Sequence, residues 1–360
     1  MTLGPSTQGN IFSRLIVLCL LAGSWGLFPL HEAKANNTWL DQDIEVAGYF
    51  AFSSAFQDAP GPSRFLPFMD SGLLVGKNWG NWRIFSELEF EQKKEVRVDH
   101  RSSRRVFRIQ RSHQFVFEPE RLWLQYSFPK ATRLRVGQIL TSFGIWNPQH
   151  FPSITNVVNR PRATMSLYPE HFLGGEIHKE TKLFGHPTSA IFYGGTPSSS
   201  DFPSRDSLGN GVIGGYGKTR LGKMISGNIG VSGVYLFNHQ VWGNAFILGS
   251  DLKMILGPFD LQAEYIRVVS RSDNALSSRT PQGSYLQGLW HITQQWGLLY
   301  QWDQILAGFS DNFDDTPETQ TIHTFGLLYT PKPWLRLKTD WEKHEGFSQW
   351  DFELSFYFSS

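Results

Sequence analysis

The sequence predicts an all-β fold: a transmembrane, antiparallel, up-and-down β-barrel of about 16 strands (14–18), with short periplasmic turns and long extracellular loops. Three observations predict it. Segments of about ten residues alternate in polarity along most of the chain, with little 3.6-residue periodicity. Aromatic residues make up 15% of a chain that is 40% hydrophobic, and they include 13 Trp and 29 Phe. Beyond residue 35, no apolar run is long enough for a spanning helix.

Residues 1–35 have the features of a cleaved export signal. Arg14 precedes a long apolar run, and Ala33-Lys34-Ala35 fits a small-x-small cleavage site. A membrane anchor helix is the alternative, but the run is shorter than the ~20 residues that a spanning helix needs. We therefore expect the mature chain to start near Asn36, and residues 36–360 to form a single outer-membrane barrel.

Cysteine content, charge and histidine spacing exclude several classes of protein. The single cysteine, Cys19, lies inside the expected signal, so the mature chain has no disulfide or thiolate metal site. Without the signal, acidic and basic residues balance, and we expect no nucleic-acid partner. The histidines are scattered without metal-ligand spacing, so the sequence predicts no metal site and no cofactor.

The first three predicted strands alternate polar and apolar residues. The segment from Asp43 to Phe52 is followed by a predicted polar loop that runs through Pro67, and a second segment turns at residues 78–81 into the third. In this third segment Glu87 and Glu89 alternate with apolar residues. A charge on the lipid side near the midplane costs ~2–4 kcal/mol, so these carboxylates are predicted to face a water-filled lumen.

A basic loop follows the third predicted strand. Residues 97–113 carry six arginines against one acid, Asp99. In the predicted topology this loop faces the cell exterior, where we expect lipopolysaccharide phosphates to contact Arg101, Arg104, Arg105 and Arg108. A transported anion, or water alone, is the alternative partner of this loop.

In the fourth predicted strand, Leu122, Leu124, Tyr126 and Phe128 alternate with Arg121, Trp123 and Gln125. In the stretch from Leu134 to Asn147, the fifth predicted strand runs out into the longest interval without a strand pattern, residues 141–171. This stretch resembles the "strand, Gly, Pro-Phe-Gly, Asn" stretch of porin-like proteins related to the phosphate-selective and carbohydrate porins, with Ser142 in place of Pro. The resemblance implies a bacterial outer-membrane diffusion channel of sixteen or eighteen strands, in which this strand delivers a loop into the barrel, and a homotrimer as one assembly. We expect the motif residues to position the loop rather than to bind solute: Gly137, Phe143, Gly144, Trp146 and Asn147.

The second half of the chain supplies eleven more predicted strands, whose connections alternate between short and long. The strands are expected near residues 172–183, 187–195, 211–222, 226–237, 244–256, 259–270, 283–293, 296–307, 320–330, 333–344 and 348–358. The last strand has an apolar face from Trp350 to Phe358 and resembles the carboxy-terminal assembly signal of outer-membrane proteins, which implies the barrel-assembly machinery as a partner. Ser359 and Ser360 follow its final aromatic residue.

The loop at residues 141–171 is predicted to fold inward and to form the narrowest part of a water-filled channel for small hydrophilic solutes. It carries Arg160 and Arg162 against one acid, Glu170, so we expect a weak anion preference. In the alternative, these two arginines pair with wall carboxylates and pin the loop. Other charged residues expected to line the lumen are Arg133, Arg135, Arg336, Lys338, Glu87, Glu89, Glu264, Asp340 and Glu342.

Two other classes of protein compete with the channel. The sequence predicts no enzyme, because the stretch from Gly214 to Thr219 ends like a phosphate-binding loop but lies in a predicted strand and has Val212 at the first glycine position. A barrel-embedded hydrolase, with a Ser/His pair assembled across strands, is one alternative. The other is a structural or adhesion barrel that is plugged by Trp123 and by the aromatic residues of the inward loop.

Overall fold

The computed structural model describes residues 44–58, 63–98, 112–149, 151–165, 167–198, 210–221, 226–239, 243–270, 281–306 and 319–359. The expected export signal lies outside these residues, as does the proposed lipopolysaccharide-facing group of Arg101, Arg104, Arg105 and Arg108. Within the described ranges, no helix is long and apolar enough to cross a membrane.

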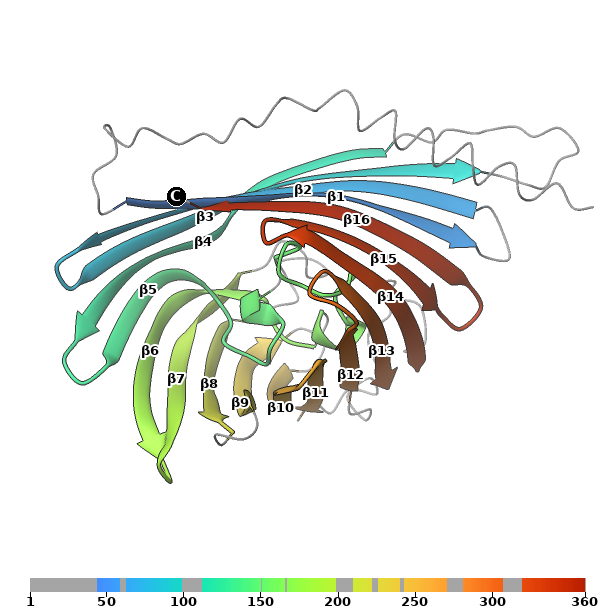
Figure 1. Ribbon diagram of the computed structural model, residues 1–360. Coiled ribbons are helices and arrows are strands. Elements are labelled where there is room, and N and C mark those ends of the chain that lie inside the picture. Colours follow the sequence, from blue (N-terminus) through green and yellow to red (C-terminus); the bar gives the residue numbers. More distant parts are fainter. Residues whose placement is uncertain are drawn as a thin grey trace, which may run out of the picture. The chain divides into compact units, whose positions relative to one another are not determined.

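Within the described residues, sixteen strands form one closed antiparallel barrel in which each strand pairs with its neighbours in sequence and β1 pairs with β16 (Figure 1). This confirms the predicted up-and-down barrel and its strand number. The strands are β1 (Ile44–Asp58), β2 (Ser63–Trp79), β3 (Trp82–Val98), β4 (Ser112–Phe128), β5 (Thr132–Leu140), β6 (His171–Leu183), β7 (His186–Ser198), β8 (Gly211–Arg220), β9 (Ser226–His239), β10 (Gly243–Leu256), β11 (Phe259–Ser270), β12 (Gln282–His291), β13 (Trp296–Leu306), β14 (Gln320–Lys332), β15 (Leu335–Lys343) and β16 (Ser348–Ser359).

The barrel has two rims that differ in the length of their connections. Turns such as residues 80–81 and 257–258 join strands at the rim that we call the short-turn rim. The opposite, long-loop rim carries the connections between β3 and β4, β5 and β6, and β13 and β14. The pairing of Ala47 with Ser359 brings the start of β1 and the end of β16 together at the short-turn rim.

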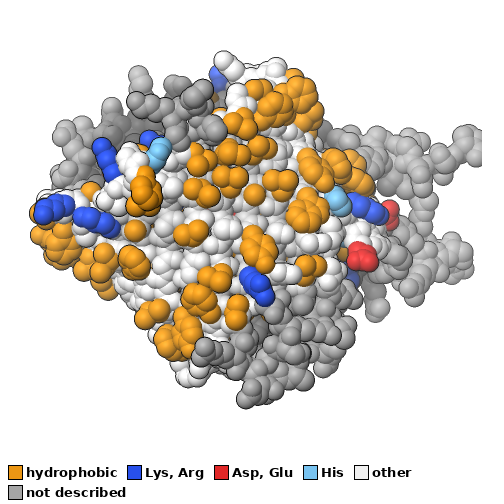
Figure 2. Space-filling model, turned by 90° about the horizontal axis from the view of Figure 1, so that it is seen from below, with side chains coloured by type: hydrophobic (Ala, Val, Ile, Leu, Met, Phe, Trp, Pro, Cys, Tyr) orange, Lys and Arg blue, Asp and Glu red, His pale blue; other side chains and the backbone are white. Residues whose placement is uncertain are grey.

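The alternation of side chains that predicted the strands separates the inside of the barrel from the outside. In β16, Asp351 and Glu353 are buried inside the barrel, whereas Trp350 and Phe352 are exposed on its outer surface. On the face shown in Figure 2, hydrophobic side chains are spread over the strands and few charged side chains interrupt them. An apolar exterior around a charged interior is the arrangement of a membrane-spanning barrel.

The expected polar loop through Pro67 is wrong, because β1 continues to Asp58 and β2 already begins at Ser63. Pro67 lies within β2 opposite Ser54. Proline has no backbone N–H, and the pairing of β2 with β3 is interrupted at Leu66 and Pro67, so no ladder hydrogen bond has to be made there. Proline thus marks a gap in the ladder instead of the end of the strand.

A β-bulge lies between β3 and β4. The register shifts between Glu87 and Leu88, which pair with Arg121 and Pro119, so Glu120 is the extra residue. A bulge re-aims the side chains beside it. Here the consecutive residues Glu120 and Arg121 both lie on the lumen side of the wall.

Candidate functional site

The connection between β5 and β6 crosses the interior of the barrel. We call residues 141–170 the crossing loop; within the described part of it, two single-turn 3-10 helices are found, η1 (Asn147–Gln149) and η2 (Arg162–Thr164). Its two ends are joined by a hydrogen bond from the Thr141 N–H to the Glu170 carbonyl, at 2.8 Å. Between these ends it contacts side chains of β1, β4, β9, β11, β12, β13 and β15, so it spans the lumen (Figure 1).

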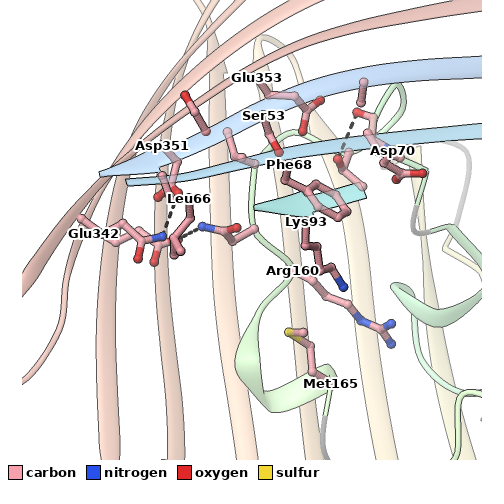
Figure 3. A pocket seen from close by; sticks show the side chains of 18 of the residues that line it. Ser53, Leu66, Phe68, Asp70, Lys93, Arg160, Met165, Glu342, Asp351 and Glu353 are labelled. Atoms are coloured by element: carbon pink, nitrogen blue, oxygen red, sulfur yellow. Dashed lines mark hydrogen bonds between the residues drawn. The ribbon is translucent and has the colours of Figure 1, made fainter. Parts of the chain in front are cut away.

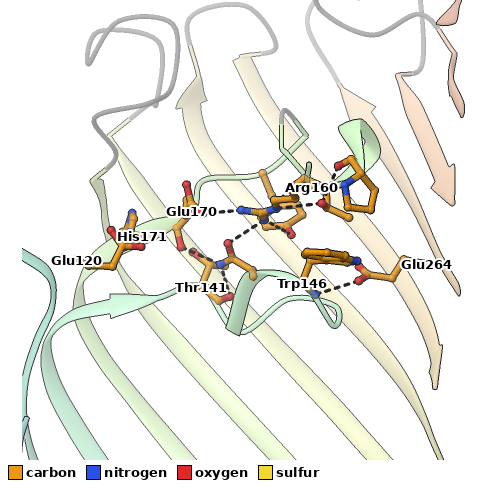
Figure 4. A network of polar contacts seen from close by, with 11 residues as sticks. Glu120, Thr141, Trp146, Arg160, Glu170, His171 and Glu264 are labelled. Atoms are coloured by element: carbon orange, nitrogen blue, oxygen red, sulfur yellow. Dashed lines mark hydrogen bonds and ion pairs between the residues drawn. The ribbon is translucent and has the colours of Figure 1, made fainter. Parts of the chain in front are cut away.

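Glu264 of β11 holds the first part of the crossing loop. Its carboxylate accepts the backbone N–H groups of Trp146 at 3.1 Å (Figure 4) and Ile145 at 2.8 Å. The Tyr285 hydroxyl donates to the same oxygen at 3.0 Å. Gly144 allows this close approach, since a Cβ there would lie 2.0 Å from a Glu264 carboxylate oxygen. Its φ of +62° also favours glycine.

Two further wall carboxylates, on β13 and β15, accept hydrogen bonds from the main chain of the crossing loop in the same way. Asp303 of β13 accepts the backbone N–H groups of Arg162 and Ala163. Asp340 of β15 accepts the N–H of Val158 at 2.6 Å. Hydrogen bonds to a charged acceptor contribute ~1.5–3 kcal/mol each, so these three carboxylates fix the course of the loop across the lumen.

Lys338 of β15 lies beneath the crossing loop. Its Nζ donates to the carbonyls of Pro152 at 2.7 Å and Val157 at 3.0 Å and to the Thr155 hydroxyl at 2.9 Å, and it lies 2.8 Å from Glu353. The Lys338 side chain has no exposed surface. The sequence placed Lys338 on the lumen side, and the structure shows that the loop covers it.

Arg160 is the polar centre of the crossing loop. Its guanidinium is 2.5 Å from the Glu170 carboxylate and donates to Asn147 Oδ1 at 3.1 Å, the Tyr168 hydroxyl at 3.1 Å and the Thr164 carbonyl at 2.7 Å (Figure 4). Burial opposes its charge, but Tyr168 and Glu170 outweigh that effect and hold the pKa of Arg160 above its ordinary value. Burial raises the pKa of the Tyr168 phenol although Arg160 counteracts it. Arg160 is therefore permanently charged, and its charge interacts with Glu170 and Tyr168 of the same loop.

The other residues of the predicted loop-positioning group lie at the base of the crossing loop. Asn147 donates to the carbonyls of Thr141 at 2.7 Å and Glu170 at 2.9 Å, so it ties the two loop ends together. The Phe143 ring packs 4.4 Å from that of Tyr168. Gly137 in β5 has a φ of +142°, and a Cβ there would meet the Leu122 carbonyl at 2.1 Å.

A cavity of about 610 Å³ lies between the crossing loop and the long-loop rim, and we call it the long-loop cavity. Its wall comes from the ends of strands next to that rim, such as Gln57 of β1 and Gln349 of β16. Among the described residues that line it, four are basic: Lys93, Lys94, Arg160 and Arg162. Nine are acidic: Asp70, Glu89, Glu91, Glu120, Glu170, Asp303, Glu342, Asp351 and Glu353.

The acidic residues lie on more than one side of the long-loop cavity. In Figure 3, Glu342 and Asp351 lie on one side and Asp70 on the other. Arg162 donates its main-chain N–H to Asp303 of the wall, and its side chain is exposed. Acidic residues therefore outnumber basic residues in the described lining of the long-loop cavity, which also contains one exposed loop arginine.

A second cavity, of about 280 Å³, lies between the crossing loop and the short-turn rim, and we call it the short-turn cavity. Its described charged residues are four arginines and one acid: Arg83, Arg121, Arg133, Arg135 and Glu176. Each arginine has a carboxylate partner, which is Glu45 for Arg83, Glu87 for Arg121, Glu180 for Arg133 and Glu176 for Arg135.

Two aromatic rings separate two of these arginines. The Phe85 and Trp123 rings stack at 5.0 Å, the Arg121 guanidinium lies 5.3 Å from the Phe85 centroid, and the Arg135 guanidinium lies 4.5 Å from that of Trp123. Trp123 is buried in this stack against the wall. It packs with its neighbours on β3 and β5 and does not project across the lumen.

Sequence reasoning placed Glu264 and Asp340 in the lumen but missed their role as anchors, and it missed Asp303 altogether. Ile145 and Glu264 are 119 residues apart in the chain. The alternation of a strand shows which face a carboxylate occupies, but no local pattern shows which part of a loop reaches it.

Comparisons with known proteins support the architecture. No family model matches the chain, and no curated protein matches its sequence. Salmonella typhi OmpF in complex with daunomycin superimposes with a TM-score of 0.59 at 10% identity, over 88% of this chain and 97% of that one. The chain has the porin fold. Pseudomonas putida OprB at low pH (TM-score 0.57, 5% identity, 88% and 93% covered) and the anion-selective porin from Comamonas acidovorans (0.55, 13%, 88% and 99%) share it. The narrower resemblance to phosphate-selective and carbohydrate porins stays a prediction.

Proposed function

We propose that the protein is an outer-membrane porin, a water-filled diffusion channel for small hydrophilic solutes. The observation that carries this proposal is the closed 16-stranded barrel whose polar lumen is crossed, but not filled, by an anchored loop. A barrel of this strand number is wide enough to leave an aqueous channel. The exposed apolar residues on its outer surface suit the hydrocarbon of a membrane.

The crossing loop is well suited to act as a fixed constriction. Glu264, Asp303 and Asp340 bind its main chain, and Lys338 is buried under it, so its position does not depend on flexible side chains at the surface. A long-loop cavity of about 610 Å³ and a short-turn cavity of about 280 Å³ remain on its two sides. These spaces favour a channel over the plugged structural or adhesion barrel.

The weak anion preference predicted from the sequence has less support than the channel itself. It depended on Arg160 and Arg162, and the charge of Arg160 is used in its ion pair with Glu170. Only the exposed side chain of Arg162 remains to attract anions among the described residues of the crossing loop. The likeness to an anion-selective porin concerns the fold and says nothing of selectivity.

Several partners belong to the same proposal. Residues 1–35 direct export, and the aromatic outer face of β16, including Trp350 and Phe358, engages the barrel-assembly machinery. Lipopolysaccharide phosphates are the proposed partners of Arg101, Arg104, Arg105 and Arg108. A homotrimer is the proposed assembly.

Swelling of liposomes in sugar solutions tests the channel. The folded protein is expected to admit pentoses and hexoses and to exclude large dextrans, whereas protein-free liposomes do not swell. A folded barrel that admits no sugar would support the plugged alternative. Hydrolysis of lipid or peptide by the purified protein, lost when a single serine is replaced, would support the hydrolase.

A further inference from the structure

We infer that the lumen changes its electrostatic character at the crossing loop, so that the channel prefers cations and rectifies ion current. The acidic long-loop cavity admits cations preferentially, and conductance is larger when the long-loop side is at positive potential. This inference rests on the proposed channel function and gives the sign of its selectivity.

Acidic residues outnumber basic residues in the described lining of the long-loop cavity, although several of them take part in ion pairs, such as Glu342 with His344 at 2.8 Å. Lys93 pairs with Glu91 at 2.9 Å and Arg160 with Glu170 at 2.5 Å. Lys338, beneath the loop, neutralises Glu353 at 2.8 Å. Even with Lys338 included, nine acidic residues face five basic residues among those described. Clefts lined by one sign of charge concentrate the counter-ion.

The short-turn cavity does not continue this negative lining. Four arginines are part of its lining, and among their described carboxylate partners only Glu176 is part of the lining as well. The Glu87 side chain is fully buried behind Arg121. Each arginine in this region has a carboxylate partner, but four arginines and one described acid line the cavity itself.

The boundary between the two compartments coincides with the β-bulge and the crossing loop. Glu120 lines the long-loop cavity, and the next residue, Arg121, lines the short-turn cavity. The Phe151 ring of the crossing loop lies 5.0 Å from the Arg121 guanidinium and 5.4 Å from the Tyr49 ring of β1. The lining residues of the lumen therefore change from acidic to basic where the crossing loop meets this side of the wall.

Such an asymmetry gives a directional current. At 0.1 M salt the Debye length is ~10 Å, comparable with the width of a narrow pore, so wall charges control the local ion concentrations. When the long-loop side is positive, cations enter through the acidic cavity while anions from the other side are held back at its boundary. Both ions then accumulate there and conductance rises. The opposite polarity depletes the boundary of ions.

Single-channel recording in planar bilayers tests the inference, with the orientation fixed by a tag on a long loop. In 0.1 M KCl we expect a reversal potential that favours K⁺ and a ratio of about two between the currents at opposite voltages. Both effects should weaken in 1 M KCl, where the Debye length is ~3 Å.

Two variants identify the source of the effect. Glu89→Gln/Glu91→Gln, which removes two acidic groups from the long-loop cavity, is expected to lower both the K⁺ preference and the current ratio. The matched control Glu180→Gln removes an acid outside that cavity and is expected not to lower the current ratio. Heat-modifiable migration on gels verifies that each variant is folded. Absence of conductance would overturn the proposed function, whereas an anion-selective or non-rectifying channel at 0.1 M KCl would overturn this inference alone.

Discussion

Replacing Glu264 by alanine is expected to release the first part of the crossing loop while the barrel stays folded. Glu264 is 3% exposed and accepts three hydrogen bonds, from Ile145 N–H, Trp146 N–H and the Tyr285 hydroxyl. It lies on the barrel wall, but two of its three donors belong to the loop. The strand ladder on both sides of Glu264 is made by the backbone and is not affected by this change.

The size of the effect follows from the two bonds that the loop itself donates. A buried donor that loses its partner costs ~1–3 kcal/mol, and water replaces part of the loss, so the attachment weakens by about 2–4 kcal/mol. Each 1.4 kcal/mol is a factor of ten, so the population with this segment detached rises about 10–10³-fold. Asp303, Asp340 and Lys338 still hold the later part of the loop.

Single-channel recording is the assay for this variant. Glu264→Ala is expected to give larger or strongly fluctuating current steps and to admit larger sugars in liposome swelling. Glu264→Gln keeps an acceptor oxygen for the two backbone N–H groups and is the matched control, with behaviour between that of the alanine variant and the native protein. A folded Glu264→Ala channel with native conductance and native noise would refute the role of Glu264 as an anchor.

Three further variants test the account. Gly144→Ala places a Cβ 2.0 Å from a Glu264 oxygen and should reproduce the fluctuating current; steady native steps would contradict this. Lys338→Met leaves Glu353 buried and unpaired, which should destabilise the barrel by about 3–5 kcal/mol; an unchanged thermal transition by circular dichroism would argue against it. Arg162→Gln removes an exposed charge, so the reversal potential should shift toward greater K⁺ preference with unchanged melting; a shift toward Cl⁻ would contradict the inferred electrostatics.

The strands of the barrel wall were predictable because the alternation of polar and apolar residues can be seen within each strand alone. In β16 the alternation between Asp351 or Glu353 and the aromatic residues reports which side chains meet water and which meet lipid. The start of β2 was not predictable in the same way, because Pro67 normally marks a break and only the pairing with Ser54 of β1 shows that β2 already includes this residue.

The site was predictable only in part. The sequence located the crossing loop and its motif, since Gly144 and Asn147 lie where patterned sequence ends. Arg160 contacts Thr164 and Glu170, which lie four and ten residues further along the crossing loop. This role differs from both predicted roles, which were contact with solute and pairing with wall carboxylates. The acidic long-loop cavity arises from strands distant in sequence, so it emerges only when the barrel closes.

The central claim is that the crossing loop narrows a water-filled channel without closing it. Single-channel conductance of the folded native protein in planar bilayers tests this claim most directly. We predict discrete, steady current steps that become larger or unstable in Glu264→Ala. A folded native barrel that carries no current, while Glu264→Ala does conduct, would show that the loop is a plug and would contradict the claim.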